Sequence, residues 1–163
     1  MHRDVRIGHV HLKVADLARS LHFYRDTLGF EITQRYGRQA VFLAAPGSGY
    51  HHHIGLNTWH SAGGSPPASN TTGLYHVAIL YPSRGALADA LRRVLAAIER
   101  GEIAGLDGAA DHGVSEALYL RDPDGNGIEL YCDKPQHEWP RDPATGEINM
   151  HTRPLDIDAL LRE

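Results

Sequence analysis

The sequence predicts an α+β fold in which two βαβββ modules follow one another in tandem and form a curved mixed sheet around a cleft. Three observations predict this. The 163 residues are the size of one compact domain. A short alternating strand followed by a helix with one apolar face occurs twice, about 70 residues apart, and further short strands follow each copy. Hydrophobic residues make up 42% of the chain and charged residues 22%, which is typical of a folded globular protein.

The first module is predicted over about residues 5–60. Its opening strand is 7–14, IGHVHLKV, where apolar and polar residues alternate. Asp16 then caps a helix that ends at Gly29. Spacings of four, three and four place the apolar positions of this helix on one face: Leu17, Leu21, Tyr24 and Leu28. Three strands are expected next, in FEITQRYG, AVFLAAPG and HIGLNTW.

The second module, about residues 74–133, repeats this order. LYHVAILY forms its first strand, Ser83 caps its helix and Gly101 ends it. The apolar face carries Leu87, Leu91, Val94 and Ile98, at the same spacing as in the first helix. A faint strand over 105–114 precedes ALYLRDPDG, which aligns Tyr119 with Phe42, and then GIELY.

Two segments lie outside the modules. Residues 61–73 are rich in Gly, Pro, Ser, Asn and Thr, which predicts a linker or surface loop. The tail, 134–163, ends in a short helix capped by Asp156, and we expect it to serve packing or dimer contact rather than chemistry. Because neither module has enough apolar residues for a core of its own, we expect one domain over 1–163.

Composition excludes several classes of function. The net charge is −4 and no basic cluster occurs, which argues against nucleic acid or an anionic membrane as a partner. Cys132 is the only cysteine, so neither a disulfide framework nor a cysteine-built zinc site can form within the chain. No apolar run approaches the ~20 residues that cross a bilayer. The first residues lack the apolar core of a signal peptide, so we expect a cytoplasmic protein.

The repeat points to a metal site. His9 and His76 each begin the first strand of a module and each precede a valine, while Glu129 in the last strand of module two corresponds to Gly55. If the strands curve around one cleft, His9, His76 and Glu129 converge. Two imidazoles and one carboxylate leave several coordination positions open, which suits Fe(II) in oxygen chemistry. Mn(II) also fits this set, and Zn(II) is the third alternative.

Three further histidines are expected to line the pocket. His11 shares the face of His9 by strand periodicity, so periodicity alone does not decide which of them is the ligand. His53 shares the face of Gly55, with a role as an extra ligand as the alternative. His60 lies at the start of the linker, where it can reach over a cleft.

The segments GHVHLKVADLARSLHFYRDTLGF, TGLYHVAIL and DHGVSEALYLRDPDGNGIELY resemble the vicinal oxygen chelate superfamily, which includes glyoxalase I, fosfomycin and bleomycin resistance proteins and extradiol dioxygenases. The likeness is to the catechol-2,3-dioxygenase-like branch and covers the chain from residue 7 onward. It implies that the metal ligands are His9, His76 and Glu129. A fourth carboxylate of the glyoxalase branch would fall on Gly55, which cannot supply it, and this favours the three-ligand enzymes.

The resemblance also implies two catalytic residues. Tyr119 precedes Glu129 by ten residues across a turn, so its hydroxyl is expected near a metal-bound substrate. His112 falls close to the acid/base histidine of the extradiol branch. The alternatives are a core aromatic residue for Tyr119, as Phe42 suggests, and a loop histidine beside Asp111 for His112.

The leading hypothesis is therefore an Fe(II)-dependent extradiol dioxygenase that cleaves a catechol-like or other vicinal diol with O2. One alternative is a glyoxalase or thiol-transferase type of metalloenzyme, although a phosphonate-binding transferase needs cations and Arg121 is the one nearby. Another is a non-catalytic binding protein of the bleomycin-resistance type, which has no need for all three ligands. We expect a homodimer. Because relatives exchange modules between chains, His9 can complete either its own site or that of a partner.

Overall fold

A computed structural model describes residues 1–163 and divides into two compact units, Met1–Thr71 and Thr72–Glu163. Each unit contains one βαβββ module with its own mixed sheet, so the α+β class and the tandem modules are confirmed. The boundary between the units falls within the segment 61–73. No helix of either unit is long and apolar enough to cross a membrane.

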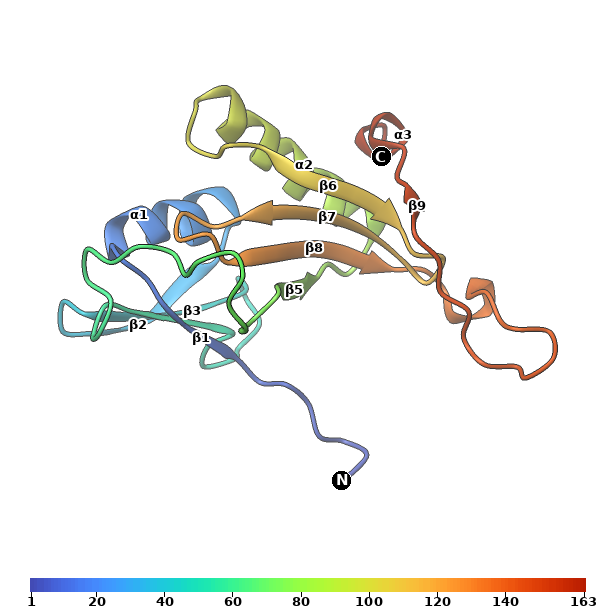
Figure 1. Ribbon diagram of the computed structural model, residues 1–163, viewed down its shortest axis with the longest axis horizontal. Coiled ribbons are helices and arrows are strands. Elements are labelled where there is room, and N and C mark those ends of the chain that lie inside the picture. Colours follow the sequence, from blue (N-terminus) through green and yellow to red (C-terminus); the bar gives the residue numbers. More distant parts are fainter. The chain divides into compact units, whose positions relative to one another are not determined.

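The first unit is a four-stranded sheet with one helical segment (Figure 1). Its strands lie in the order β1-β4-β3-β2, with β1 parallel to β4 and the other pairs antiparallel. Its elements in chain order are β1 (Val10–Lys13), α1 (Leu17–Leu21), η1 (His22–Thr27), β2 (Glu31–Tyr36), β3 (Ala40–Ala44) and β4 (Ile54–Asn57).

The first helix begins and ends as predicted but changes type within its length. Asp16 accepts a hydrogen bond from the amide of Arg19, and Gly29 follows the helix with a φ of 89°. After α1 the chain continues as a π-helix, η1, rather than as an α-helix to residue 28. The extra residue per turn lets both Phe23 and Tyr24 face the core, with their rings edge to face at 5.0 Å.

The opening strands are shorter than the sequence pattern indicates. The predicted strand 7–14 begins only at Val10, because β1 has a partner only where Ile54 starts β4. In the second unit, β5 (Val77–Leu80) likewise begins later than predicted. His9 and His76 therefore precede their strands by one residue instead of beginning them.

The second unit is a five-stranded sheet in the order β5-β8-β7-β6-β9. The pair β5 and β8 is parallel, and the others are antiparallel. Figure 1 shows β7 and β8 side by side in the middle of this sheet. The remaining elements are α2 (Arg84–Glu99), β6 (Leu106–Asp111), β7 (Ser115–Arg121), β8 (Gly127–Asp133), η2 (Gln136–Glu138), β9 (Arg153–Pro154) and α3 (Ile157–Leu161).

Helix α2 confirms the predicted capping and buried face. The hydroxyl of Ser83 accepts a hydrogen bond from the amide of Ala86, and Gly101 follows the helix with a φ of 73°. Leu87, Leu91 and Val94 are fully buried, whereas Ile98 is only half-buried in the last turn. These side chains, with Leu118, Leu120 and Leu130 of the sheet, form the core of the unit.

The tail adds a strand and a helix to the second unit. β9 pairs with β6, so that Ala110 lies opposite Pro154 and Asp111 opposite Arg153. Asp156 caps α3 as predicted by accepting a hydrogen bond from the amide of Ala159.

Candidate active site

Four of the five expected metal-ligand and catalytic residues, all but His9, are brought together in the second unit. In the antiparallel pair β7 and β8, Tyr119 lies directly opposite Glu129. The Tyr119 hydroxyl donates to Oε1 of Glu129 over 3.0 Å. On the other oxygen, Oε2, the carboxylate is 2.9 Å from Nε2 of His76. The Glu129 side chain is mostly buried, with 12% of its area exposed, so water competes only weakly for these contacts.

The turn between β7 and β8 sets this register. Asp122 accepts hydrogen bonds from the amides of Asp124 and Asn126 and from the Asn126 side chain. Gly125 takes a φ of 81°, which a residue with a side chain rarely adopts. This confirms the predicted Asp/Asn/Gly turn, and a tight turn fixes which residues face each other across the hairpin.

Gly127 brings His76 to Glu129. A Cβ atom at this glycine would lie 2.2 Å from the carbonyl oxygen of Tyr75 and 3.0 Å from Cβ of His76. The segment before β5 can therefore cross the start of β8 this closely only because residue 127 has no side chain. The sequence reasoning gave this glycine no role, although a glycine inside a strand pattern is a known signal of close backbone approach.

Replacing Gly127 with alanine is expected to displace His76 from Glu129 and to destabilise the fold by about 1–3 kcal/mol, the usual cost of overpacking. Urea unfolding measures the stability, and the loss of metal affinity reports the displaced histidine. Gly108→Ala in β6 is the matched control, since nothing lies within 4 Å of a Cβ atom there. Equal effects of the two substitutions would contradict the close-approach argument.

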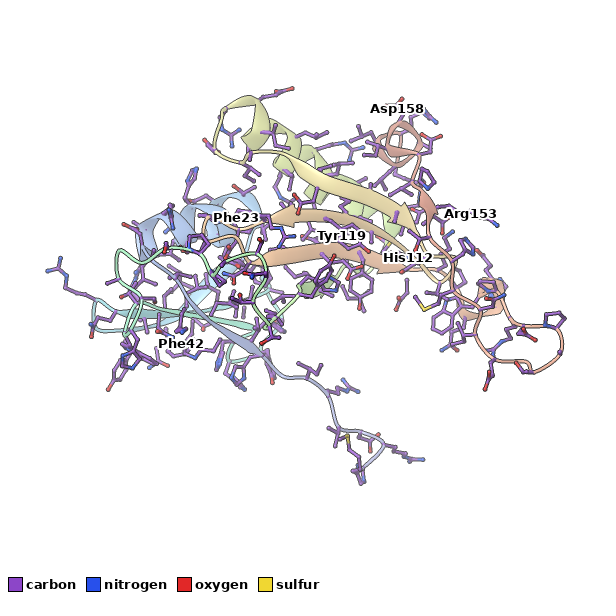
Figure 2. The ribbon with its side chains drawn as sticks, viewed as in Figure 1. Phe23, Phe42, His112, Tyr119, Arg153 and Asp158 are labelled. Carbon is purple, nitrogen blue, oxygen red and sulfur yellow. The ribbon has the colours of Figure 1, made fainter.

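His112 contacts the opposite side of the tyrosine hydroxyl. Its Nε2 is 2.6 Å from Oη of Tyr119. Its Nδ1 lies 3.1 Å from the carbonyl oxygen of His151 and 3.2 Å from the hydroxyl of Thr152. Figure 2 shows Tyr119 and His112 near one another on this unit. A continuous polar chain thus runs from the tail through His112 and Tyr119 to Glu129.

The Tyr119 phenol is held in its protonated form. Desolvation is the largest cause that raises its pKa, to about 12, and the hydrogen bond to the Glu129 carboxylate adds to the effect. Tyr119 is therefore a hydrogen-bond donor, and not a phenolate, over the whole physiological pH range.

His76, Tyr119 and His112 line a cavity of about 370 Å³ within the second unit, a size in the usual range of small-molecule sites. Its walls combine apolar surface with the polar chain described above. At its edge, Arg121 is paired with Asp107 over 2.7 Å, so the cation that a transferase would use is already neutralised. The lining residues are Tyr75, His76, Asp107, Ala110, His112, Tyr119, Leu120, Arg121, Gly127, Ile128 and Thr152.

His9 lies in the first unit, within a cluster of histidines. Its ring centroid is 4.4 Å from that of His52 and 6.5 Å from that of His51. Nδ1 of His51 and Nδ1 of His52 are 2.7 Å apart. Desolvation, followed by the charges of neighbouring histidines, with His9 the largest of them, lowers the pKa of His52. The cluster therefore disfavours the accumulation of positive charge, and neutral imidazole is the form that binds metals.

The absence of a side chain at Gly55 makes room for a neighbouring ring in the first unit. A Cβ atom there would lie 2.9 Å from the ring of His11, which packs against Phe42 and Trp59. Where the second unit has the carboxylate of Glu129, the first unit thus leaves room for an imidazole. Desolvation of the ring and the neighbouring His9 lower the pKa of His11.

The other two expected pocket histidines have different surroundings. Nδ1 of His53 accepts a hydrogen bond from the amide of Ala45, and its ring packs against Tyr50. His60 is exposed in the turn that follows β4. The two contacts of His53, with Ala45 and Tyr50, do not involve His9 or His11.

Neither unit by itself gathers three His, Cys, Asp or Glu side chains in an arrangement that could hold a metal ion. The second unit does hold two side chains of metal-ligating types, an imidazole and a carboxylate, with Nε2 of His76 2.9 Å from Oε2 of Glu129. Nδ1 of His76 is buried and has no hydrogen-bond partner, so one ring nitrogen of this imidazole makes no polar contact within the protein.

Comparison with known proteins decides the family. The model of the Glyoxalase/Bleomycin resistance protein/Dioxygenase superfamily matches residues 6–130. The chain belongs to this superfamily. A Catechol-2,3-dioxygenase of Bacillus subtilis (strain 168) is 44% identical over 163 residues, which are 100% of this chain and 53% of that protein. The Biphenyl-2,3-diol 1,2-dioxygenase 3 of Rhodococcus globerulus is 33% identical over 131 residues, 78% of this chain and 63% of that protein. The chain thus spans a little over half the length of the curated superfamily members that it matches.

Solved structures of the superfamily share the fold. A glyoxylase/bleomycin resistance protein/dioxygenase domain from Frankia sp. EAN1pec has a TM-score of 0.61 at 24% identity, and 80% of this chain aligns with 98% of that one. A glyoxalase/dioxygenase from Nostoc punctiforme has a TM-score of 0.59 at 21% identity, with 80% and 92% aligned. At this identity the likeness concerns the fold alone.

The tail contacts the candidate site directly. We expect the tail to serve packing or dimer contact rather than chemistry, and His151 and Thr152 both contact Nδ1 of His112. No residue pattern in the tail signals this. The contact arises because β9 pairs with the end of β6, which brings residues distant in sequence together.

Proposed function

We propose that the protein is an extradiol-type dioxygenase that opens the ring of a catechol-like vicinal diol with O2. The observation that carries the proposal is the series of contacts from His76 through Glu129 and Tyr119 to His112. It joins two metal-ligating side-chain types to a proton-donating phenol and a second imidazole, and His76, Tyr119 and His112 line one cavity. The two dioxygenases among the curated relatives support it, since both are named as dioxygenases of aromatic diols.

In this proposal His76 and Glu129 hold a divalent metal together with His9 from the first unit. Fe(II) is the ion proposed, with Mn(II) and Zn(II) as alternatives that the metal analysis below distinguishes. The metal supplies Lewis acidity and open positions where a diol and O2 meet. To hold an ion, Nε2 of His76 and the Glu129 carboxylate would have to be free of any proton between them, and Nδ1 of His76, which has no partner, can carry the proton of the neutral ring.

The remaining residues handle protons and exclude water. The Tyr119 hydroxyl stays protonated, and the single proton that it donates to Glu129 here would become available to an oxygen of the substrate once Glu129 is engaged as a ligand. His112, 2.6 Å behind the Tyr119 hydroxyl, can give or take a proton. Ala110, on the same face of the sheet as Tyr119, adds apolar surface to the cavity lining.

Two features rank the other metalloenzyme chemistries lower. Gly55 occupies the position where a fourth carboxylate ligand of an isomerase would lie, and the ring of His11 fills the space beside it. Arg121 forms an ion pair with Asp107, so its charge is already paired and is not free to bind a phosphonate in this cavity.

The test is metal content and ring cleavage of the untagged wild-type chain, loaded anaerobically with Fe(II), Mn(II) or Zn(II) in turn. We expect about one equivalent of metal per chain and, with Fe(II), uptake of one O2 for each catechol consumed, with the absorbance of the ring-opened product. A chain that binds none of the three ions contradicts both metalloenzyme proposals and favours the binding protein. A metal-loaded chain that isomerises or conjugates thiols without O2 uptake contradicts the dioxygenase.

We also propose that the protein is a homodimer, in which His9 completes either the site of its own chain or that of the partner. If His9 completes the partner's site, a mixture of His9→Ala and Glu129→Ala chains forms heterodimers with one intact site of two. Metal binding, absent in either variant alone, is then partly restored on mixing. A monomer in light scattering, or no restoration in a demonstrated heterodimer, contradicts the exchanged arrangement.

A further inference from the structure

The C-terminal segment places two different groups at one nitrogen of His112. The carbonyl oxygen of His151 is 3.1 Å from Nδ1 and the hydroxyl of Thr152 is 3.2 Å from it. A carbonyl oxygen only accepts hydrogen bonds, whereas a hydroxyl can donate or accept. Thr152 also lines the cavity that holds Tyr119.

The other end of the ring has its hydrogen-bond direction set by Tyr119. The single phenolic proton of Tyr119 is donated to the carboxylate of Glu129, which cannot donate in return. Oη of Tyr119 is then an acceptor toward His112, and Nε2 of His112 must carry a proton to make the 2.6 Å contact.

With Nε2 protonated, Nδ1 of His112 carries no proton in the neutral ring and one proton in the charged ring. In the neutral ring, Nδ1 has no proton and needs a donor, which the Thr152 hydroxyl provides. In the charged ring, Nδ1 carries a proton and needs an acceptor, which the His151 carbonyl provides. The ring therefore has a partner at both nitrogens in either protonation state, without any rotation.

We propose that Thr152 and the His151 carbonyl form a positioning pair that holds His112 in one orientation while it gains and loses a proton. Thr152 is the residue that stabilises the neutral ring. The use of that proton in catalysis rests on the proposed dioxygenase function, but the pairing itself does not.

Few other charges bear on His112. The Asp111 carboxylate next to it is bound by Nζ of Lys134 at 2.7 and 2.8 Å, so these two charges cancel locally. From β7 the ring faces Tyr119, with Glu129 behind it, and from the tail it faces His151 and Thr152. Changing Thr152 alters none of these charges.

The test is an NMR titration of His112 in the metal-free full chain, with its signal assigned from a His112→Gln spectrum. Thr152→Val removes the hydroxyl at nearly constant volume and leaves the carbonyl, so the neutral ring alone loses a partner. We expect the titration midpoint of His112 to rise by about half a pH unit or more relative to wild type, the equivalent of one lost hydrogen bond. Thr152→Ser keeps a hydroxyl and is expected to titrate close to wild type.

A midpoint in Thr152→Val that equals wild type, or one in Thr152→Ser that moves as far as in Thr152→Val, would overturn the proposal. In an active enzyme, Thr152→Val is also expected to shift the pH profile of kcat in the same direction while KM stays near wild type. If the wild-type chain shows no ring cleavage, the proposed function fails, and the NMR comparison still decides the inference.

Discussion

Glu129→Ala is expected to abolish stable metal binding and, with it, ring cleavage. Glu129 is the carboxylate in the second unit that contacts both His76 and Tyr119. Loss of an outer-shell partner alone typically costs about 10–100-fold in metal affinity, and loss of a direct ligand costs more. Metal content after anaerobic loading and dialysis measures the effect, and circular dichroism shows whether the sheet persists.

Two variants make this result specific. Glu129→Gln keeps the shape and removes the charge, so we expect weakened but detectable metal binding. Glu147→Ala removes a carboxylate from the exposed tail and should match wild type. Full metal occupancy in Glu129→Ala would show that the site lies elsewhere in the chain.

Tyr119→Phe is expected to lower kcat by about 10²–10³-fold, the usual cost of removing one positioned hydrogen-bond donor, while metal is retained. The substitution removes only the hydroxyl that joins Glu129 to His112. The fold should tolerate it, because the repeat-related position in the first unit is already a phenylalanine, Phe42, opposite Gly55.

The ionisation of Tyr119 gives a pH test of the same variant. Its pKa is raised from 10.0 to about 12, so the folded state keeps a proton that the unfolded chain loses. The resulting stabilisation is complete below pH 10 and is lost as the pH rises toward 12. The wild-type minus Tyr119→Phe difference spectrum should therefore show no phenolate absorbance at pH 10.

Tyr36→Phe, at an exposed tyrosine of β2, is the matched control for both measurements. Its kcat should equal that of wild type. A phenolate that appears in the Tyr119 difference spectrum near pH 10 would contradict the burial of Tyr119 and its hydrogen bond to Glu129. An unchanged kcat in Tyr119→Phe would remove Tyr119 from the mechanism.

The local sequence determined the elements of this fold and several members of its site. Apolar spacing identified both helices, and Asp16, Ser83 and Asp156 marked helix starts because a side-chain oxygen there satisfies a free backbone amide. The ten-residue separation across the Asp/Asn/Gly turn placed Tyr119 opposite Glu129, since a hairpin register follows from its turn.

Only the tertiary structure decided which residues distant in sequence contact these side chains or leave room for them. The approach of His76 to Glu129 depends on the missing side chain of Gly127, and the room for His11 depends on Gly55. The contact of Thr152 with His112 depends on the pairing of β9 with β6. Such contacts join residues far apart in the chain, and their geometry is set by how whole strands pack rather than by the pattern within any one of them.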